Sequence, residues 1–455
     1  MKLHILGICG TFMGGIALLA RELGHEVSGS DQNTYPPMST MLQEQGITLF
    51  DGYDPTVLDA DLDIVIIGNT LSRGNPVIEH VLNARLPYTS GPAWLSENLL
   101  RHRHVLAVSG THGKTTTSSM LAWVLEYAGL SPGFLIGGVA ENFGISARYG
   151  DSEYFVVEAD EYDTAFFDKR SKFIHYLPRT LIINNIEFDH ADIFADIGDI
   201  IVEFRRLVRI VPGDGRILTH HQDENIQKVL EAGCWSSQET FAAEGDWQYH
   251  PEAPDYSRFT VSYQKQPVTL VSWSLLGRHN AENALAVMAA AQHIGIRPEM
   301  VAEALATYKS VKRRMQKLAV LNGVTVYDDF AHHPTAIAAT LSGLRASLKS
   351  GRIISVFEPR SNTMKMGVHR DTLASAFRDT DILLAYSPPG LSWDMAAVFD
   401  RDMKSCRIHD DIDELLEDLL RELQLDDHVI IMSNGDFGGL HQKLITRLES
   451  NDKAG

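Results

Sequence analysis

One short stretch of the chain has the residue types that bind phosphate. Residues 110–116 read Gly-Thr-His-Gly-Lys-Thr-Thr, with an apolar run before them and a helical pattern of apolar residues after them. Glycines let backbone N–H groups turn toward an anion, a lysine reaches terminal phosphates and a threonine hydroxyl is a ligand for Mg²⁺. The loop is shorter than the general pattern, because Val108 stands where the first glycine would. An ordinary glycine-rich turn is the alternative, but the flanking strand and helix patterns favour phosphate binding.

Carboxylates and a histidine follow two other strand-like runs. Glu158 comes directly after the apolar run 154–157, and His190 follows the next run along the chain. Since parallel strands end at one edge of a sheet, both side chains are expected beside the phosphate loop, as candidate Mg²⁺ ligands. For Asp160, Glu161 and Asp163 a solvated acidic loop is at least as well supported, because adjacent carboxylates repel without a cation. For His190 the residues alone support a structural role and metal ligation equally.

A glycine-rich segment near the N-terminus is a second candidate nucleotide site. It spans residues 7–15, and the next strand-like run ends at Asp31. This order is typical of a dinucleotide fold, with phosphates at a helix start and an acidic residue on a ribose. The positions two and five after Gly7 are Cys9 and Phe12 instead of glycine, so the spacing does not support NAD. A nucleotide diphosphate other than NAD remains open.

Polar residues at the starts of later elements are further candidates. Asn280 opens a long helical segment, where contact with a nucleotide base and helix capping are equally supported. A later strand-like run ends in acids that include Asp329, followed by His332 and His333, a segment able to close over a nucleotide. No zinc site is predicted there, because adjacent histidines lack the helical i, i+4 spacing and no cysteine is near. Arg360 follows another strand, in a loop suited to substrate recognition or to an ordinary surface.

These residues need a scaffold, and the apolar pattern predicts one. Strand-length apolar runs alternate with helical patterns, which is typical of parallel α/β layers. The runs are residues 3–6, 64–67, 105–108, 154–157, 181–183, 353–357, 382–385 and 429–432. The 455 residues, divided by about 150 per domain, suggest roughly three domains. Glycine turns near residues 7, 110 and 435 suggest three nucleotide-fold-like units, with boundaries near 101–104 and 310–314.

Charge and cysteine content exclude several classes of protein. Lys plus Arg is 40 and Asp plus Glu is 59, giving a formal charge of −19. This sign disfavours nucleic acid and anionic membrane surfaces as partners. The three cysteines are far apart, so a disulfide framework is not predicted. With no secretion signal and no apolar stretch of about 18 residues, we expect a cytoplasmic protein without an anchor.

Together, in this order along the chain, these motifs resemble the Mur ligase family. Its members are three-domain, ATP-dependent enzymes that join amino acids or peptides to UDP-N-acetylmuramate derivatives. The resemblance covers essentially the whole chain and implies an α/β fold of three domains. They are a Rossmann-like N-terminal domain at residues 1–102, a P-loop mononucleotide-binding central domain at 103–311 and a Rossmann-like C-terminal domain at 312–455. The N-terminal glycine segment is similar to the family's UDP-sugar site, which explains the failed NAD spacing.

The resemblance also implies which residues bind each ligand. ATP would contact Gly110, Thr111, His112, Gly113, Lys114, Thr115, Thr116, Asn280, Asn283, Arg314 and Asp329. UDP-N-acetylmuramate would contact Gly10, Thr11, Phe12, Met13, Asp31, Asn69 and Thr70. A peptide would contact His332, Arg360, Ser361 and Asn362. The implied catalytic residues are Lys114, Glu158, His190, Arg314 and His333, and the implied Mg²⁺ ligands are Thr115, Glu158 and His190.

The implied reaction passes through an acyl phosphate. The muramate carboxylate attacks the γ-phosphate of ATP, and the amine of the second substrate then displaces phosphate. Some family members place a carbamylated lysine soon after the metal-binding histidine. Residues 191–209 contain no lysine, so a second Mg²⁺ must be held without one.

Two loops point to a subgroup of the family. Residues 7–14 read GICGTFMG and residues 357–364 read FEPRSNTM. This combination resembles members that attach L-alanyl-γ-D-glutamyl-meso-diaminopimelate in peptidoglycan recycling, whereas members that add L-alanine usually have GxGGxGM and FQPHRY-like segments. A UDP-N-acetylmuramate–L-alanine ligase is therefore the second candidate, and a non-catalytic nucleotide-dependent switch and a dehydrogenase are candidates of other classes. The expected assembly is a monomer or weak homodimer.

Overall fold

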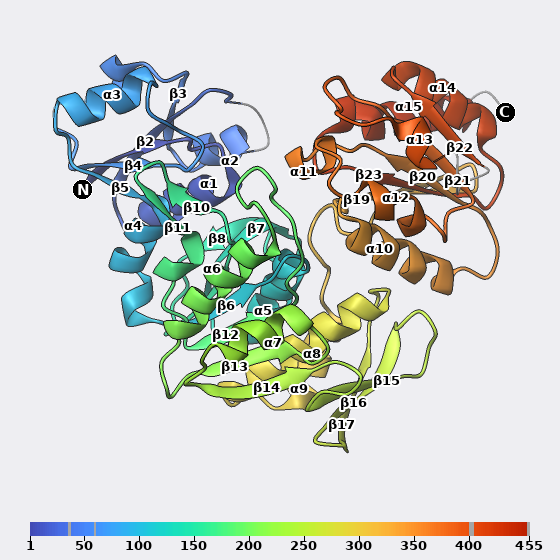
Figure 1. Cartoon of the computed structure of the whole chain (residues 1–455), viewed down its shortest axis with the longest axis horizontal. Coiled ribbons are helices and arrows are strands. Elements are labelled where there is room, and N and C mark those ends of the chain that lie inside the picture. The colour runs from blue at the N-terminus through green and yellow to red at the C-terminus, as the bar shows by residue number, and fades with distance from the viewer. Residues whose placement is uncertain (35–37, 59–60, 400–404, 453–455) are drawn as a thin grey trace.

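Three large sheets follow one another along the chain (Figure 1). The structure is a computed structural model that describes residues 1–34, 38–58, 61–399 and 405–452. In Figure 1 the N-terminal unit is blue, the central unit runs from light blue through green to yellow, and the C-terminal unit is orange to red. None of the helices in the described ranges has the length and apolar character needed to cross a membrane.

The N-terminal sheet is parallel throughout, in the order β3-β2-β1-β4-β5. Its strands are β1 (Lys2–Leu6), β2 (Glu26–Asp31), β3 (Thr48–Asp51), β4 (Ile64–Ile67) and β5 (Tyr88–Ser90). The helices between and after them are α1 (Thr11–Glu22), α2 (Met38–Glu44), α3 (Pro76–Asn83) and α4 (Gly91–Asn98). The strand order changes direction beside β1, so the loops after β1 and β4 meet at the carboxyl edge of the sheet, where such folds bind ligands.

The central sheet has the order β17-β16-β15-β14-β13-β12-β6-β9-β7-β8. Its parallel strands are β6 (His104–Ser109), β7 (Gly133–Ala140), β9 (Tyr154–Glu158), β12 (Thr180–Ile183), β13 (Arg216–His220), β14 (Ser237–Phe241) and β15 (Trp247–Pro251). Antiparallel edges are formed by β8 (Ile145–Arg148), β16 (Arg258–Tyr263) and β17 (Gln266–Ser272), and a separate hairpin by β10 (Asp163–Ala165) and β11 (Asp168–Ser171). The α-helices are α5 (Lys114–Tyr127), α6 (Ile197–Arg209), α7 (Glu224–Glu231), α8 (Arg278–His293) and α9 (Pro298–Ala306).

The C-terminal sheet has the order β18-β19-β23-β20-β21-β22. β18 (Gln316–Leu321) is antiparallel to β19 (Val324–Asp329), and the remaining pairs, with β20 (Ile353–Phe357), β21 (Ile382–Tyr386), β22 (Cys406–His409) and β23 (His428–Met432), are parallel. The helices are α10 (Pro334–Ser347), α11 (Asn362–Lys365), α12 (Arg370–Ala376), α13 (Met395–Phe399), α14 (Ile412–Glu422) and α15 (Leu440–Asp452).

Apolar side chains of the N-terminal and central units share one core cluster, and each unit also has a further cluster of its own. Helix α1 packs on β7 and β8, where a Cβ at Gly15 would lie 2.2 Å from Leu135 Cδ1 and 3.3 Å from Ala147 Cβ. A side chain at Gly15 would therefore require Leu135 to move, which shows how closely the two units pack. The C-terminal unit has apolar clusters of its own on each face of its sheet.

The predicted α/β class with three parallel-based units is confirmed, and each predicted run lies in a strand. The first predicted domain boundary, at 102/103, falls between η2 (Leu100–His102) and β6, and the second, at 311/312, falls between α9 and β18. Both boundaries remain predictions. The antiparallel edges were not predicted. Strands such as β17 and β18 are largely exposed or half-buried, so they lack the continuous apolar run that marks a buried parallel strand.

Buried His4 predicts a loss of stability in acid. Its ring lies within the N-terminal sheet, 2.9 Å from Ser28 Oγ and 2.8 Å from Ser30 Oγ, and burial lowers its pKa to about 4. Because the unfolded chain binds this proton near pH 6.5, stability is lost as pH falls from about 6.5 toward 4, at up to about 1.4 kcal/mol per pH unit. In urea unfolding at pH 7 and pH 5, His4→Gln should show a smaller pH difference than the wild type. His80→Gln, on exposed α3 surface, should match the wild type, and an unchanged difference in His4→Gln would contradict the assignment.

Candidate functional site

The phosphate loop joins β6 to α5. Its glycines need positive φ angles, +126° at Gly110 and +80° at Gly113, which L side chains rarely adopt. Lys114, the first residue of α5, turns its ammonium back to the loop, 2.6 Å from the carbonyl oxygen of Gly110 and 3.3 Å from that of Thr111. Thr116 continues the first turn of α5. The Lys114 ammonium and the N-terminus of α5 therefore lie side by side at the loop, so both can contribute positive charge to a bound phosphate.

Two asparagines after β12 hold this loop in shape. Asn185 Oδ1 accepts from His112 N at 2.8 Å, and Asn184 Nδ2 donates to Thr117 Oγ1 at 3.1 Å. A Cβ at Gly110 would lie 2.9 Å from the carbonyl oxygen of Asn185. Sequence reasoning missed this role, although a pair of amide side chains directly after the neighbouring parallel strand was a readable signal.

Glu158 lies at the end of β9 beside the first residues of α5. Thr115 Oγ1 donates to Glu158 Oε1 at 2.9 Å, and Gly137 N donates to Oε2 at 2.6 Å. Burial raises the pKa of Glu158, against the opposing effects of the Gly137 bond and the Lys114 charge. A hydroxyl and a carboxylate are hard oxygen donors of the kind that Mg²⁺ takes beside substrate phosphates, so the predicted pair Thr115 and Glu158 fits such an ion.

Glu161 is a central residue of the site that the sequence did not single out. Its side chain is 2% exposed, so the solvated-loop interpretation is wrong for this residue. Its carboxylate lies 3.1 Å from Lys114 Nζ and 3.2 Å from His190 Nε2. Burial alone would raise the pKa of Glu161, but Lys114 and His190 hold it at about 2. Burial likewise opposes the charged form of His190, yet the Glu161 carboxylate raises the pKa of that histidine above its usual value.

His190 therefore faces Glu161 in this structure, with Asp160 beside them. Donor atoms of Asp160, Glu161 and His190 lie within 4.8 Å of one another, which makes them a candidate cation site. The predicted metal-binding histidine and the predicted phosphate-binding lysine thus share one carboxylate.

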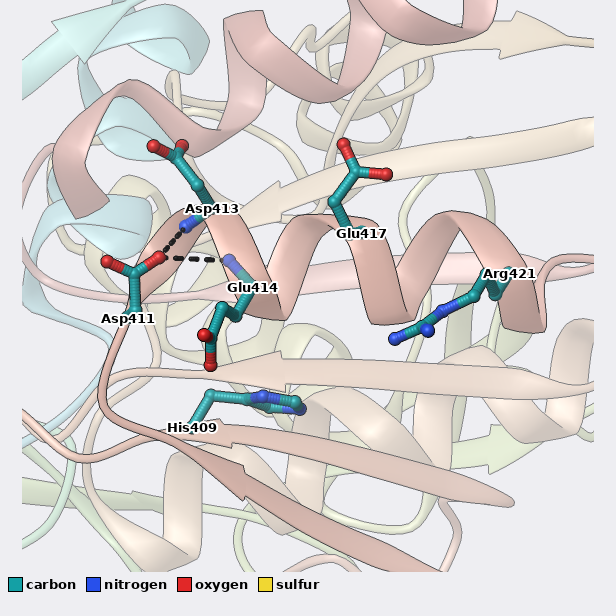
Figure 2. Close-up of a pocket in the computed structure, with 6 residues that line it drawn as sticks. All are labelled: His409, Asp411, Asp413, Glu414, Glu417 and Arg421. Atoms are coloured by element: carbon teal, nitrogen blue, oxygen red, sulfur yellow. Dashed lines mark hydrogen bonds between the residues drawn. The ribbon is translucent and has the colours of Figure 1, made fainter.

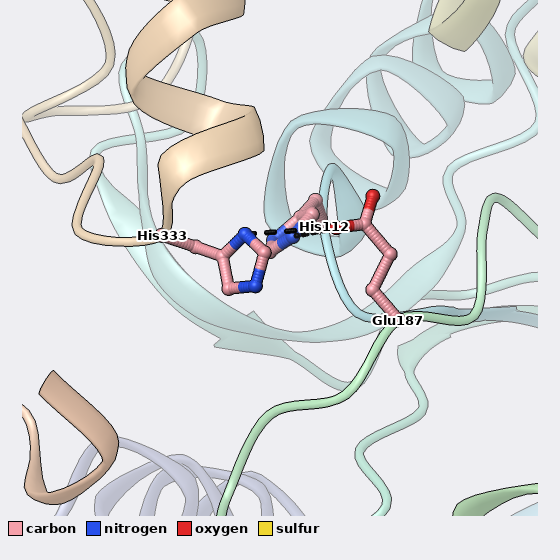
Figure 3. A group of neighbouring side chains, drawn as sticks. All are labelled: His112, Glu187 and His333. Atoms are coloured by element: carbon pink, nitrogen blue, oxygen red, sulfur yellow. Dashed lines mark ion pairs between the residues drawn. The ribbon is translucent and has the colours of Figure 1, made fainter. Parts of the chain in front are cut away.

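The C-terminal unit reaches the phosphate loop through His333, the N-cap of α10 (Figure 3). The rings of His333 and His112 have centroids 4.4 Å apart, and both rings face Glu187. Thr335 Oγ1 donates to Glu187 Oε2 at 2.7 Å. Burial lowers the pKa of His333 to about 3, so this ring is neutral at pH 7. His332 Nδ1 lies 3.0 Å from the carbonyl oxygen of Phe330 instead.

Of the other residues predicted to bind ATP, Asn283 lies against the phosphate loop, whereas Arg314 and Asp329 contact other groups. Asn283 Oδ1 is 2.8 Å from where a Cβ of Gly113 would lie, and Asn280 Oδ1 accepts from Asn283 Nδ2 at 3.5 Å. The Arg314 guanidinium lies 5.0 Å from the centroid of the Phe330 ring. The carboxylate oxygens of buried Asp329 accept from Met315 N and Ala331 N, at 2.7 and 2.8 Å. The predicted ribose contact of Asp329 would therefore compete with two backbone bonds.

The residues predicted to bind the UDP-sugar meet at the carboxyl edge of the N-terminal sheet. Gly10 is the N-cap of α1, whose first turn contains Thr11, Phe12 and Met13 and carries no acidic residue. Across the loop, Asn69 and Thr70 follow β4, and Thr70 Oγ1 lies 3.7 Å from where a Cβ of Gly7 would be. Asp31 Oδ2 accepts from Cys9 N at 2.9 Å, so this predicted ribose ligand also fixes the loop.

A buried lysine joins the N-terminal loop to the carboxylates of the central unit. Lys172 Nζ lies 5.4 Å from the centroid of the Phe12 ring, 5.3 Å from that of Tyr162 and 3.9 Å from Asp160 Oδ2. Its side chain is 10% exposed. Sequence reasoning missed Lys172, because a lysine in the polar stretch after β11 carries no local signal of burial.

The residues predicted to bind peptide lie around α11, which projects from the C-terminal unit toward the central unit (Figure 1). Asn362 Nδ2 donates to Asp192 Oδ2 at 3.1 Å, just after His190 in the chain. Ser361 is the N-cap of α11, where its Oγ accepts from Met364 N. Arg360 instead pairs at 2.8 Å with Asp436, whose side chain is 77% exposed. The structure thus brings Asn362 to the central site and leaves Arg360 at the surface.

A separate hollow of about 450 Å³ lies in the C-terminal unit, away from these residues (Figure 2). It is lined by His409, Asp411, Asp413, Glu414, Glu417 and Arg421. Asp411 caps α14 by accepting from Asp413 N and Glu414 N. Acidic residues in the first turn also complement the helix dipole, so the charge of this hollow is explained by the stability of α14.

The three units and the phosphate loop of the central unit define the class of protein. The chain belongs to the Mur ligase family, whose members are ATP-dependent ligases. It matches the Mur ligase family catalytic domain at residues 2–103, the Mur ligase middle domain at 108–291 and the Mur ligase glutamate ligase domain at 313–435.

Three relatives show how similar the chain is to characterised members. It is 52% identical to the UDP-N-acetylmuramate–L-alanyl-γ-D-glutamyl-meso-2,6-diaminoheptandioate ligase of Escherichia coli, with 100% of both chains covered. It is 44% identical to a murein peptide ligase from Psychrobacter arcticus, whose crystal structure matches with a TM-score of 0.76 over 98% of each chain. It is 31% identical to the UDP-N-acetylmuramate–L-alanine ligase of Clostridium perfringens, covering 84% of this chain and 82% of that one.

Gly113 tests whether the loop's shape is needed for nucleotide binding. A Cβ at Gly113 would lie 2.8 Å from Asn283 Oδ1 and 2.9 Å from Asn184 Nδ2, in addition to the strain of a positive φ. We expect Gly113→Ala to weaken ATP binding at least about tenfold, measured by calorimetry. Gly129→Ala is the matched control, since Gly129 has φ +76° and no atom within 4 Å of its Cβ position. Equal ATP affinity in both variants would contradict this reading of the loop.

Proposed function

We propose that the protein joins UDP-N-acetylmuramate to L-alanyl-γ-D-glutamyl-meso-diaminopimelate, with cleavage of ATP to ADP and phosphate, in peptidoglycan recycling. The observation that carries the proposal is 52% identity, over the full length of both chains, to a relative named for that reaction. The relative named for L-alanine addition is 31% identical over a shorter stretch. The proposed setting is the cytoplasm, where ATP and UDP-sugars are found, and the monomer or weak dimer stays a prediction.

The arrangement of charges supports a reaction between two anions. A carboxylate that attacks a phosphate is repelled by it, so a ligase must place cations between them. Lys114 supplies one at the phosphate loop, where the γ-phosphate would take the place of the Glu161 carboxylate. Lys172 supplies a second between the UDP-sugar loop and the central unit. Arg314 belongs to the segment that leads into the C-terminal unit, and we propose that it contacts the γ-phosphate.

We propose two Mg²⁺ sites built from residues of the central unit. Thr115 and Glu158 would hold the first, and His190 with Asp160 and Glu161 would hold the second in place of the missing lysine. Bound Mg²⁺ supplies positive charge that offsets repulsion between carboxylate and phosphate. The protein's own contribution is orientation: Asn184 and Asn185 fix the loop, and Gly137 N fixes the Glu158 carboxylate.

The amine of the second substrate must be neutral when it attacks the acyl carbon. His333 is neutral and lies at the junction of the central and C-terminal units, next to the phosphate loop. We propose that His333 orients the amine and that His332, Arg360, Ser361 and Asn362 bind the peptide.

Phosphate release from ATP and UDP-N-acetylmuramate tests the reaction and its acceptor. The tripeptide should support release, with little release for L-alanine or for no acceptor. A preference for L-alanine would favour the L-alanine ligase, and no release with either acceptor would favour a nucleotide-dependent switch.

Lys114 is the most direct test of the phosphate site. Lys114→Ala should lower phosphate release about 1,000-fold or more, because it removes the ammonium that lies against the loop carbonyls of Gly110 and Thr111. UDP-N-acetylmuramate binding, measured by calorimetry, should stay largely intact, since that ligand is proposed to bind the N-terminal unit. Lys349→Ala, on exposed surface, is the control and should keep wild-type turnover. Full activity in Lys114→Ala would rule out the assignment.

Arg360 tests peptide recognition. Its partner Asp436 is largely exposed, so their ion pair is weak and the guanidinium is available to a substrate carboxylate. Arg360→Ala should raise the KM for tripeptide about tenfold or more and leave the KM for ATP near the wild-type value. Arg378→Ala, another exposed arginine of the C-terminal unit, should change neither constant. A rise in the KM for UDP-N-acetylmuramate alone would place Arg360 at a different substrate.

A further inference from the structure

Three side chains from separate segments converge on one point between the central and C-terminal units (Figure 3). His112 comes from the phosphate loop, Glu187 from the segment after β12, and His333 from the start of α10. Donor atoms of these residues lie within 4.8 Å of one another. The adjacent pair His332 and His333 lacks a zinc-binding spacing, but the fold gives His333 two different partners.

The distances within this cluster are too long for hydrogen bonds and suit a shared ion. His112 Nε2 lies 3.7 Å from Glu187 Oε2, and His333 Nδ1 lies 3.6 Å from the same oxygen. Tetrahedral zinc with bonds of about 2.0–2.1 Å holds its ligand atoms about 3.3–3.4 Å apart. The two histidine–carboxylate distances are therefore within a few tenths of an ångström of this geometry, and the two histidine nitrogens lie within 4.8 Å of each other.

The His112 side chain has an unused donor or acceptor aimed at this point. His112 Nε2 is buried and has no hydrogen-bond partner within the described chain. The side chain of His333 is 7% exposed; its Nε2 also has no hydrogen-bond partner within the described chain, and its Nδ1 accepts a hydrogen bond of 3.3 Å from Thr335 N. A buried polar atom without a partner costs free energy, and a bound cation would remove that cost.

We propose that His112 Nε2, a ring nitrogen of His333 and Glu187 Oε2 form a binding site for a first-row transition metal ion, with Zn²⁺ as the reference ion. Two imidazole nitrogens and one carboxylate suit Zn²⁺ and its neighbours, whereas Mg²⁺ prefers oxygen ligands. Three protein ligands leave a fourth position for water. Because the ligands come from two units, the ion fixes the C-terminal unit over the phosphate loop, next to Lys114.

Metal binding by the full-length protein tests the site without any assay of activity. Metal-free protein, in excess Mg²⁺ to occupy oxygen-rich sites, is titrated with Zn²⁺ by calorimetry and with Co²⁺ by visible absorption. The wild type should bind one tight ion per chain and give the intense Co²⁺ spectrum of a tetrahedral site. His112→Ala and His333→Ala should each lower the affinity about 100-fold or more. Glu187→Gln keeps the side-chain shape and should also weaken binding, which guards against misfolding of the alanine variants.

Two controls separate this site from other histidine–carboxylate pairs. His441→Ala removes a histidine that lies 3.1 Å from Asp328, and should leave Zn²⁺ affinity unchanged. His190→Ala disrupts the cluster with Glu161 and should also retain the tight ion. Wild-type affinity in His112→Ala and His333→Ala overturns the proposal. Loss of the ion in His190→Ala with retention in His333→Ala also overturns it, since the ion then binds at the other cluster.

Discussion

The site is organised around a buried ion pair between Lys114 and Glu161. Neither charge would be stable alone in this position, because desolvating an ammonium or a carboxylate costs several kcal/mol. Here the ammonium also donates to the Gly110 carbonyl, and the carboxylate also faces His190. In the proposed reaction a ligand phosphate would replace the carboxylate at the lysine, so the ammonium would keep an anionic partner.

Buried cations of this kind explain how a protein with a negative net charge can bind negatively charged substrates. The formal charge of −19 describes the whole surface, whereas the site has cations at a few buried or half-buried points. Lys114 and Lys172 lie where the carboxyl edges of the N-terminal and central sheets come together, and helix starts add positive potential there. Net charge therefore describes the protein surface as a whole, and the local arrangement of cations sets the sign of the ligand.

The phosphate loop and the parallel sheets could be predicted from sequence because their signals are local. Glycines, a lysine and flanking apolar periodicity all lie within about twenty residues of each other. The role of Glu161 could not be predicted, because its burial arises only when Lys114 and His190 converge on it from other segments. For the same reason the pairing of His112 with His333 carries no sequence signal, since more than 200 residues separate them. The zinc-spacing rule compares His333 with the adjacent His332, whereas the fold places His333 beside His112 and Glu187 of the central unit.

The continuous apolar core between the N-terminal and central units has a mechanical consequence. Helix α1 lies against β7 and β8 with no room for a side chain at Gly15, so the two units cannot slide without breaking packed apolar contacts. The C-terminal unit has separate cores and meets the site through polar side chains such as Thr335 and Asn362. The N-terminal and central units therefore form one packed body that carries both glycine-rich loops, whereas the C-terminal unit is joined to it by the segment between α9 and β18, where Lys312 N donates to the carbonyl oxygen of Val139.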